Sequence, residues 1–197
     1  MMFHEKEKIN DLQRHLNTFY PFTEKMIIVW TSKAAPSSEV IDLVNLYGAE
    51  LINYEFTDSL SDCRNSALEF LLNENDQVNW VLYLDPDEMI SNPINDLNSI
   101  RSMAETDLEG FKFKFANIMP DGDPTFSETV RMFKLSSKFK YQNRVHETLD
   151  HSFKEVSESD PVFIGKAPFT VIHLGMNKGD QRLQEKLNKY TELLIKE

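Results

Sequence analysis

The sequence contains a single cysteine, Cys63, among its 197 residues. An intrachain disulfide is therefore excluded, and one lone thiol is typical of a protein from a reducing compartment. The longest apolar runs, such as residues 26–30 and 80–84, are far too short to cross a bilayer. The first ten residues are charged almost from the start, which argues against a secretion signal. We therefore expect a cytoplasmic protein without a transmembrane segment.

The chain also lacks an excess of positive charge: 21 basic residues stand against 32 acidic ones, for a net charge of -11. The basic residues are scattered along the sequence, so nucleic acid is not an expected partner. An acidic protein that binds an anionic ligand needs a metal ion or a few well-placed Arg and Lys side chains. Only six glycines and no repeated tract argue against a fibrous, disordered or solenoid protein. A chain of this length predicts one domain with one substantial core.

Helix and strand patterns alternate through the first half. Helical spacing of apolar residues predicts a helix that Pro21 stops, and a second helix starts at Ser37 and Ser38 and ends at Gly48. Asp62 can cap a third helix. The apolar segments 26–30, 49–56 and 79–84 are the predicted strands. This alternation favours a parallel sheet that helices cover on both faces.

The second half has a different pattern. Residues 110–118 alternate strictly between apolar and polar side chains, and residues 129–135, 138–142, 162–165 and 169–175 are further predicted strands. We expect an antiparallel or mixed extension of the sheet. Residues 120–128 and 150–161 are expected to be loops over a site. A final helix is predicted from its apolar stripe of Leu183, Leu187, Tyr190 and Leu194.

The sharpest local feature is VLYLDPDEMI, in which an apolar strand runs directly into Asp85, Asp87 and Glu88. In open parallel sheets, ligands collect at the carboxyl ends of the strands. Two carboxylates separated by one residue can share a hard divalent cation, which in turn binds the phosphates of a nucleotide. The alternative is a solvated turn or a helix cap, because D-x-D is common by chance.

Four further residues are candidates for a functional role. Arg64 opens a predicted helix, where a guanidinium could reach a diphosphate or could be an ordinary surface charge. His146 and Glu147 follow one predicted strand, and His173 lies near the end of another. Imidazole is a reasonable ligand for manganese-like ions, and a free carboxylate can act as a general base. Taken singly, each histidine is more often a core or surface residue than a ligand.

Five segments occur in an order that resembles the family 2 glycosyltransferases of the GT-A fold. They are LSDCRNSALEF, NWVLYLDPDEMI, TVRMFKL, YQNRVHETL and VIHLG. The similarity is to the branch with an RN helix, a D-x-D-E strand end, an R-x-F strand, a V-H-E segment and a late histidine. It implies an α/β, Rossmann-like fold with a mixed, mostly parallel central sheet flanked by helices on both faces. The single domain 1–197 would then comprise a nucleotide-binding half (1–90), an acceptor-side half (91–176) and a C-terminal helix (177–197).

The resemblance also implies roles for individual residues. Asp87 would bind Mn²⁺ or Mg²⁺, Asp85 would contact the ion through water or bind the ribose, and His173 would complete the metal site. Glu88 would support this loop. Arg64 and Arg131 would face the diphosphate of a nucleotide sugar, with UDP as the expected nucleotide. Glu147 would be the base that deprotonates a glycan or other hydroxyl acceptor, with His146 orienting it or binding the acceptor. The resemblance leaves the oligomeric state open.

The sequence departs from the family at two places. Relatives carry a D-x-x-S-x-D pattern for the nucleoside after the first predicted strand, whereas residues 30–33 here are Trp, Thr, Ser and Lys. Trp30 either stacks on the base or belongs to the core. The strand that should precede His4 is almost absent, since only residues 1–3 come before it.

Two other functions stay open. A non-catalytic domain of the same fold could bind a sugar or a partner protein. A phosphotransferase with an aspartyl nucleophile also places D-x-D after an apolar strand, but it needs a small hydroxyl residue where this chain has Met89.

Overall fold

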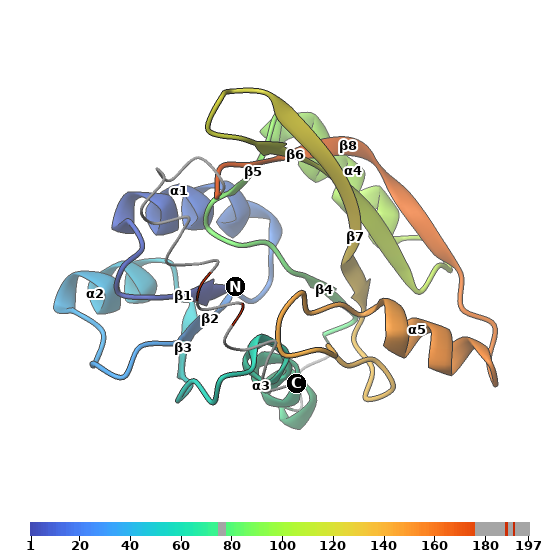
Figure 1. The fold of residues 1–197 in the computed structure, drawn as a ribbon, viewed down its shortest axis with the longest axis horizontal. Helices are drawn as coiled ribbons and strands as arrows, with labels where there is room; N and C mark the ends of the chain where they lie inside the picture. Colours follow the sequence, from blue (N-terminus) through green and yellow to red (C-terminus); the bar gives the residue numbers. More distant parts are fainter. Residues whose placement is uncertain (75–77, 176–187, 189–190, 192–197) are drawn as a thin grey trace.

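The computed structural model describes residues 1–74, 78–175, 188 and 191. It is a mixed α/β fold with two sheets (Figure 1). The first sheet has three strands in the order β1-β2-β3, and the second has five in the order β4-β7-β6-β8-β5. The predicted C-terminal helix and its stripe of Leu183, Leu187, Tyr190 and Leu194 lie outside the described residues.

The three-stranded sheet is parallel, as the first half of the sequence predicts. It consists of β1 (Met2–Phe3), β2 (Ile27–Trp30) and β3 (Glu50–Asn53). Ile28 of β2 packs with α1 (Ile9–Phe19) and α2 (Ser38–Leu46), while its neighbour Val29 packs on the other face with α3 (Leu60–Asn73). Both faces of β2 are thus covered, which is why this strand is apolar throughout. Before His4, the two residues of β1 suffice to pair with β2.

The first helices begin and end at recognisable signals. The Ser37 hydroxyl accepts a hydrogen bond from the Val40 amide at the start of α2, and Gly48 adopts a φ of +56° just after its end. A short 3-10 turn, η1 (Tyr20–Phe22), contains Pro21 and follows α1. The prediction that Asp62 caps α3 was wrong. The cap is Ser59, whose hydroxyl accepts from the Asp62 amide.

The five-stranded sheet is mainly antiparallel, so a mostly parallel central sheet is not what the structure has. Its strands are β4 (Trp80–Leu82), β5 (Glu88–Ile90), β6 (Gly110–Ile118), β7 (Pro124–Lys134) and β8 (Ile164–His173). Of its four strand pairs, only β6 with β8 is parallel. The apolar strand β4, expected in the parallel sheet, pairs antiparallel with β7 instead. The mixed strand pairing predicted for the second half is confirmed, but these strands form a separate sheet and not an extension of the first.

Several local predictions in the second half need correction. Residues 150–157 form the helix α5 (Asp150–Ser157) and not a loop, and most of residues 120–128 belong to β7. Residues 138–142 form no strand, because their ladder contact is the single bridge from Gln142 to Thr148. The helix α4 (Pro93–Ala104) and the short strand β5 were not predicted.

The apolar clusters on the two sheets are continuous. Phe111, Phe113 and Phe115 of β6 pack with Leu97 and Met103 of α4. A second cluster joins β7 to α5 and to the Leu68 and Leu71 side of α3. Because α3 also packs against β2, it connects the core of one sheet with that of the other. Within the described part of the chain, no helix is long and apolar enough to cross a membrane.

Candidate active site at the β4–β5 junction

The D-x-D segment forms the turn between β4 and β5. The Glu88 amide donates to the Asp85 carbonyl over 2.9 Å, and the Asp85 amide donates to a Glu88 carboxylate oxygen over 2.8 Å, so Glu88 closes the turn from both sides. Because β4 and β5 lie at opposite edges of the five-stranded sheet, this segment runs between the two sheets (Figure 1). Arg14 of α1 donates to the Pro86 carbonyl over 2.9 Å. Side chains from both halves of the fold therefore surround Asp85 and Asp87.

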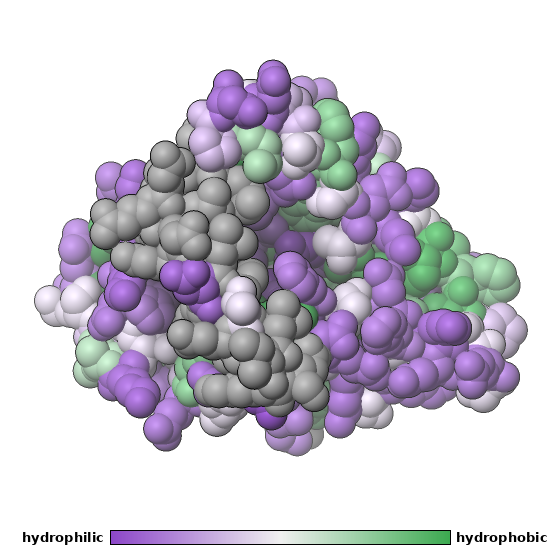
Figure 2. Space-filling model, in the orientation of Figure 1, coloured by the Kyte–Doolittle hydropathy of each residue, from purple (hydrophilic) through white to green (hydrophobic). Residues whose placement is uncertain are grey.

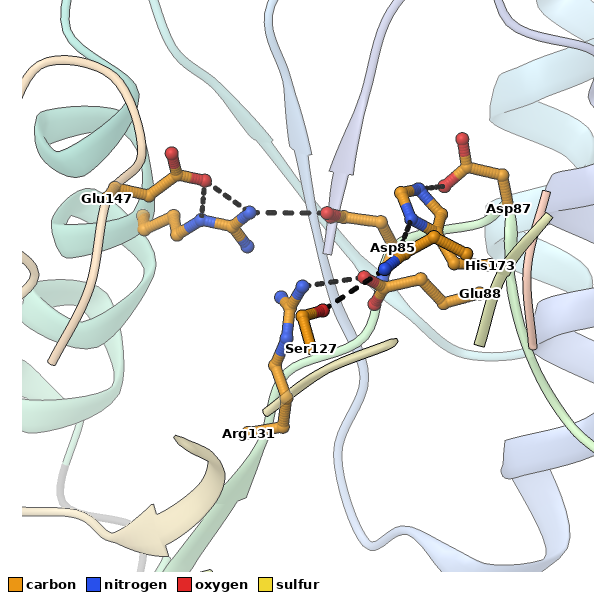
Figure 3. Close-up of polar contacts among 9 residues, drawn as sticks. Asp85, Asp87, Glu88, Ser127, Arg131, Glu147 and His173 are labelled. Carbon is orange, nitrogen blue, oxygen red and sulfur yellow. Dashed lines mark hydrogen bonds and ion pairs between the residues drawn. The ribbon is translucent and has the colours of Figure 1, made fainter. Parts of the chain in front are cut away.

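Arg64 links two of the predicted site carboxylates. Its Nε lies 2.7 Å from Glu147 Oε1, and its Nη2 lies 3.2 Å from Asp85 Oδ2 (Figure 3). The guanidinium lies 3.9 Å from the centre of the Tyr83 ring, in cation–π geometry. Arg64 is only 4% exposed, whereas the Asp85 and Glu147 side chains keep 22% and 11% exposure. Arg64 thus lies beneath the two acids and holds them, instead of lying open toward a diphosphate.

The interior of this network contains polar atoms that no described group satisfies. They are Nη1 of Arg64, the hydroxyls of Tyr83 and Tyr141, Oδ1 of Asp85 and Nε of Arg131. Burial raises the pKa of Tyr141 to about 12, so its hydroxyl keeps its proton at neutral pH. Buried polar groups in folded proteins are normally paired with protein or with water. This concentration of unsatisfied donors and acceptors marks a place for water or a polar ligand.

Asp85 and Glu88 have opposite electrostatic environments, although they share one turn. Burial alone would raise the pKa of Asp85, but the guanidinium groups of Arg64 and Arg131 outweigh it and lower that pKa to about 2. Glu88 is fully enclosed, and burial raises its pKa to about 7 despite its ion pair with Arg131 at 2.6 Å. Asp85 is therefore an anion at neutral pH, and Glu88 ties the turn to β7.

Glu147 is presented by a loop that α3 holds in place. The Asn65 side chain donates to the Tyr141 carbonyl over 2.9 Å and accepts from the Tyr141 amide over 2.8 Å. Gln142 and Thr148 close the loop by pairing their backbones. His146 adopts a φ of +55° inside it and is exposed. The loop therefore directs Glu147 toward Arg64 and His146 toward solvent.

Asp87 and His173 meet at the other end of the turn. Nε2 of His173 lies 3.8 Å from Oδ1 of Asp87, and Nδ1 lies 2.8 Å from Oδ1 of Asn117 (Figure 3). The Leu174 amide donates to the Asp87 carbonyl over 3.0 Å, which fixes the two segments together. A Cβ at Gly175 would lie 2.3 Å from His173 Nε2 and 2.7 Å from Asp87 Oδ2. Any side chain at position 175 would therefore press against both His173 and Asp87.

The donor set in this space suits a divalent cation. An imidazole nitrogen and a carboxylate oxygen are both ligands for manganese-like ions, and at 3.8 Å the two can bind one ion. Asp85 is turned toward Arg64, and among the described residues no three His, Cys, Asp or Glu side chains are gathered as a ligand cluster. Asp87 and His173 thus fit a metal as two of its ligands.

The indole ring of Trp30 is not exposed at this site. It is 3% exposed in the cluster of β1, β2, α1 and α2, and its indole N–H donates to the Ala34 carbonyl over 2.7 Å. Of the two alternatives for Trp30, stacking on a nucleobase is therefore wrong for this conformation, and the core role holds.

Two surface cavities lie away from this site. One of about 420 Å³ is lined by residues of α4 together with Pro168, and another of about 250 Å³ lies over Lys112, Lys114 and Lys166. The face of the molecule drawn in Figure 2 is hollowed near its centre, where hydrophilic residues border the hollow. In Figure 1 the chain between β4 and β5 passes through this central region.

Sequence reasoning missed the groups that lie around Arg64 and His173. These are Tyr83, Tyr141, Asn117, Ser127 and Gly175. One signal was available: Asn117 follows Phe113 and Phe115 at alternate positions, so a polar side chain continues an apolar face. In comparisons with known proteins, no family model matches the chain, and no curated protein matches its sequence.

Proposed function

We propose that this chain is a metal-dependent, inverting glycosyltransferase of the GT-A type. It would move a sugar from a nucleotide-sugar donor, with UDP as the expected nucleotide, to a hydroxyl group of a glycan or another acceptor. Glu147 is the proposed base, Asp85 and Asp87 are the proposed donor-side acids, and Arg131 acts with Arg64 to keep Asp85 charged. The sequence motifs that resemble the family 2 enzymes supply the reaction class.

The observation that supports the proposal best is the bridge made by Arg64. One guanidinium contacts Glu147 from the loop 141–149 and Asp85 from the β4–β5 turn. A transferase must hold its acceptor base and its donor-binding acids on either side of one reacting carbon. Arg64 and Glu147, which are 83 positions apart in the sequence, meet here. The side chains of Asp85 and Glu147 both remain partly exposed.

Each group then has a chemical task. Glu147 accepts the proton of the acceptor hydroxyl, which makes that oxygen a better nucleophile. A divalent cation at Asp87 and His173 would neutralise negative charge on the departing diphosphate. Asp85, which is held as an anion by Arg64 and Arg131, offers oxygen acceptors for water or a ribose hydroxyl. The exposed His146 lies beside Glu147 and can contact the acceptor.

Calorimetric titration tests the donor half of the proposal. UDP, GDP, CMP and dTDP would each be titrated with and without Mn²⁺. We expect one of them to bind only with the metal, and Asp87→Asn to weaken that binding at least about tenfold. Asp160→Asn, which removes an exposed acid paired with Lys138, is the control and should bind like the wild type. Equal binding of all four nucleotides without metal would contradict the proposal.

A non-catalytic binding domain of the same fold is the second candidate. The ion pair between Glu147 and Arg64 favours this candidate. A carboxylate that is already paired with a cation is a weaker acceptor for the proton of a hydroxyl group. Glu147→Gln separates the two functions. It should abolish sugar transfer to the acceptor but keep nucleotide affinity if Glu147 is the base. Unchanged product formation would remove Glu147 from catalysis.

A further inference from the structure

Asn117 makes a set of hydrogen bonds that leaves little freedom for its amide. Its Nδ2 lies 3.4 Å from the Thr125 carbonyl. It also lies 3.2 Å from the Ser127 hydroxyl, a contact drawn in Figure 3. A backbone carbonyl can only accept, so the NH₂ end of the amide faces Thr125. The oxygen of the amide is then the atom that faces His173, at 2.8 Å.

This orientation determines where the proton on His173 resides. An amide oxygen can only accept a hydrogen bond, so Nδ1 of the neutral imidazole must donate to it. Nε2 then carries the lone pair. It points toward Asp87 Oδ1 at 3.8 Å, in the space that a side chain at Gly175 would fill. An imidazole nitrogen and a carboxylate oxygen on the same side of this turn are both ligand types for a divalent cation.

We propose that Asn117 is the positioning residue of the metal site, because it fixes His173 as the Nδ1–H tautomer with Nε2 directed at the ion beside Asp87. Histidine ligands commonly donate their second ring N–H to an oxygen, which sets both the tautomer and the ring orientation. This inference rests on the proposed metal-dependent function. It adds residues of the β6–β7 pair, Asn117 and Ser127, which touch neither donor nor acceptor.

The register of the sheet explains why these residues can do this. Asn117 pairs with Thr125 of β7 on one side and with His173 of β8 on the other. The side chains of neighbouring strands at paired positions lie close together on the same face. His173 in turn pairs with Glu88 of β5, which follows Asp87 directly. The sheet thus carries Asn117, His173 and Glu88 in one row, and Asp87 directly precedes that row in the chain.

The first test reads the tautomer in the metal-free protein by ¹⁵N NMR of the His173 ring. The wild type should show the Nδ1–H form, and Asn117→Ala should give a mixture or the Nε2–H form. Asn117→Asp keeps an acceptor oxygen and should restore the Nδ1–H form. Lys114→Ala, on the opposite face of the same strand, is the matched control and should leave the ring as in the wild type.

The second test measures Mn²⁺ affinity by calorimetry in the presence of UDP. Asn117→Ala should lose about 10- to 100-fold in affinity, and Asn117→Asp should recover most of it, which a merely structural role would not produce. If the wild type binds Mn²⁺, His173→Ala loses it and Asn117→Ala keeps both affinity and tautomer, the positioning role is overturned while the proposed function stands. If the wild type binds no Mn²⁺ with any nucleotide, the metal-dependent function fails and this inference fails with it, whatever the tautomer.

Discussion

Among the charged residues of the site, Arg64 is the one whose substitution we expect to destabilise the fold most. It lies beneath Asp85 and Glu147, whose side chains remain partly exposed. Removing one partner of a buried ion pair leaves the other charge without compensation, which typically costs about 3–5 kcal/mol. Arg64→Met keeps the aliphatic volume but takes away the positive charge. Since Asp85 and Glu147 keep some exposure, we expect a loss of roughly 3 kcal/mol in the free energy of unfolding at neutral pH.

Urea unfolding at two pH values checks this expectation. The pKa of Asp85 is held at about 2, below its ordinary value of 3.8, so its stabilising charge is present above about pH 4 and lost as the pH falls toward 2. The cost of Arg64→Met should therefore shrink at pH 3. Arg101→Met, in which the lost guanidinium lies on the exposed side of α4 against Phe22, should cost under about 0.5 kcal/mol. An equal cost of Arg64→Met at both pH values would show that charge pairing is not its cause.

Glu88 should give stability the opposite dependence on pH. Burial raises its pKa from 4.5 to about 7, so the folded state prefers the protonated form. Its contribution is fully present below about pH 4.5 and is lost as the pH rises through 7. We expect the unfolding free energy of the wild type to fall between pH 5 and pH 8, and this decline to be absent in Glu88→Gln. A decline of the same size in the variant would assign it to another group.

Among the elements, α3 is the one that organises the site, because it supplies both Arg64 and Asn65. Asn65→Ala removes two hydrogen bonds to the Tyr141 backbone and leaves a half-buried amide and carbonyl unpaired. We expect a cost of about 2 kcal/mol and much faster hydrogen exchange at the Tyr141 amide. The Gln142 amide, which donates to Thr148 within the loop, should keep its protection.

Asn73→Ala at the end of the same helix is the control for this variant, since Asn73 is exposed. It should leave the exchange of Tyr141 unchanged. Slow exchange at Tyr141 in Asn65→Ala would mean that the loop is held by contacts other than the Asn65 clamp.

The helices and strands show which features the sequence could predict and which it could not. β6 was predicted with its observed bounds, because its alternation is complete and one face is buried. α4 had readable signals, since Asn92 caps it and Pro93 occupies its first turn, but they were not used. α5 has no side-chain cap, and the contacts that hold it are tertiary. Phe153 packs on Phe139 with ring centres 4.3 Å apart, and the Ser152 hydroxyl donates to the Lys138 carbonyl and accepts from the Lys140 amide. A helix that depends on a tertiary contact leaves only a weak local pattern.

Strand pairing was harder to predict than strand position. The alternation of helix and strand correctly indicated a parallel β2–β3 pair, but it also assigned residues 79–84 to the same sheet. Those residues pair with β7, some fifty positions later, and no local pattern records that choice. The acids were found because they follow an apolar strand directly. The roles of Asn117 and Gly175 were not predicted, because these roles depend on contacts with other segments of the chain.

At the scale of the whole molecule, the chain was predicted to form one domain, although its strands form two sheets. The apolar clusters support one cooperative unit. Met26 packs against the clusters of both sheets, and so does Ile27. The site itself lies where the sheets meet, so its geometry depends on this coupling.

The two tryptophans allow each half to be observed separately. Trp30 lies in the core of the three-stranded sheet, and Trp80 packs against Phe111 in the other. Trp80→Phe and Trp30→Phe each leave one fluorescent reporter. We expect each variant to show a single urea transition, because two-state unfolding is the rule for one cooperative domain. Because Trp30→Phe changes a buried residue, its midpoint is compared only with that of variants built upon it.

Leu16→Ala, added to each single-tryptophan variant, decides whether the halves unfold together. Leu16 is fully buried in α1 against the three-stranded sheet, so the change should cost about 2–5 kcal/mol. In one domain, both reporters should register this loss as an equal fall in unfolding free energy. In two independent units, the Trp30 signal would shift and the Trp80 signal would not. Leu46→Ala, at an exposed position that ends α2, should move neither. A loss of unfolding free energy seen only in the Trp30 signal would mean that the two sheets unfold independently. The contacts of Arg64 would then join two units that fold independently.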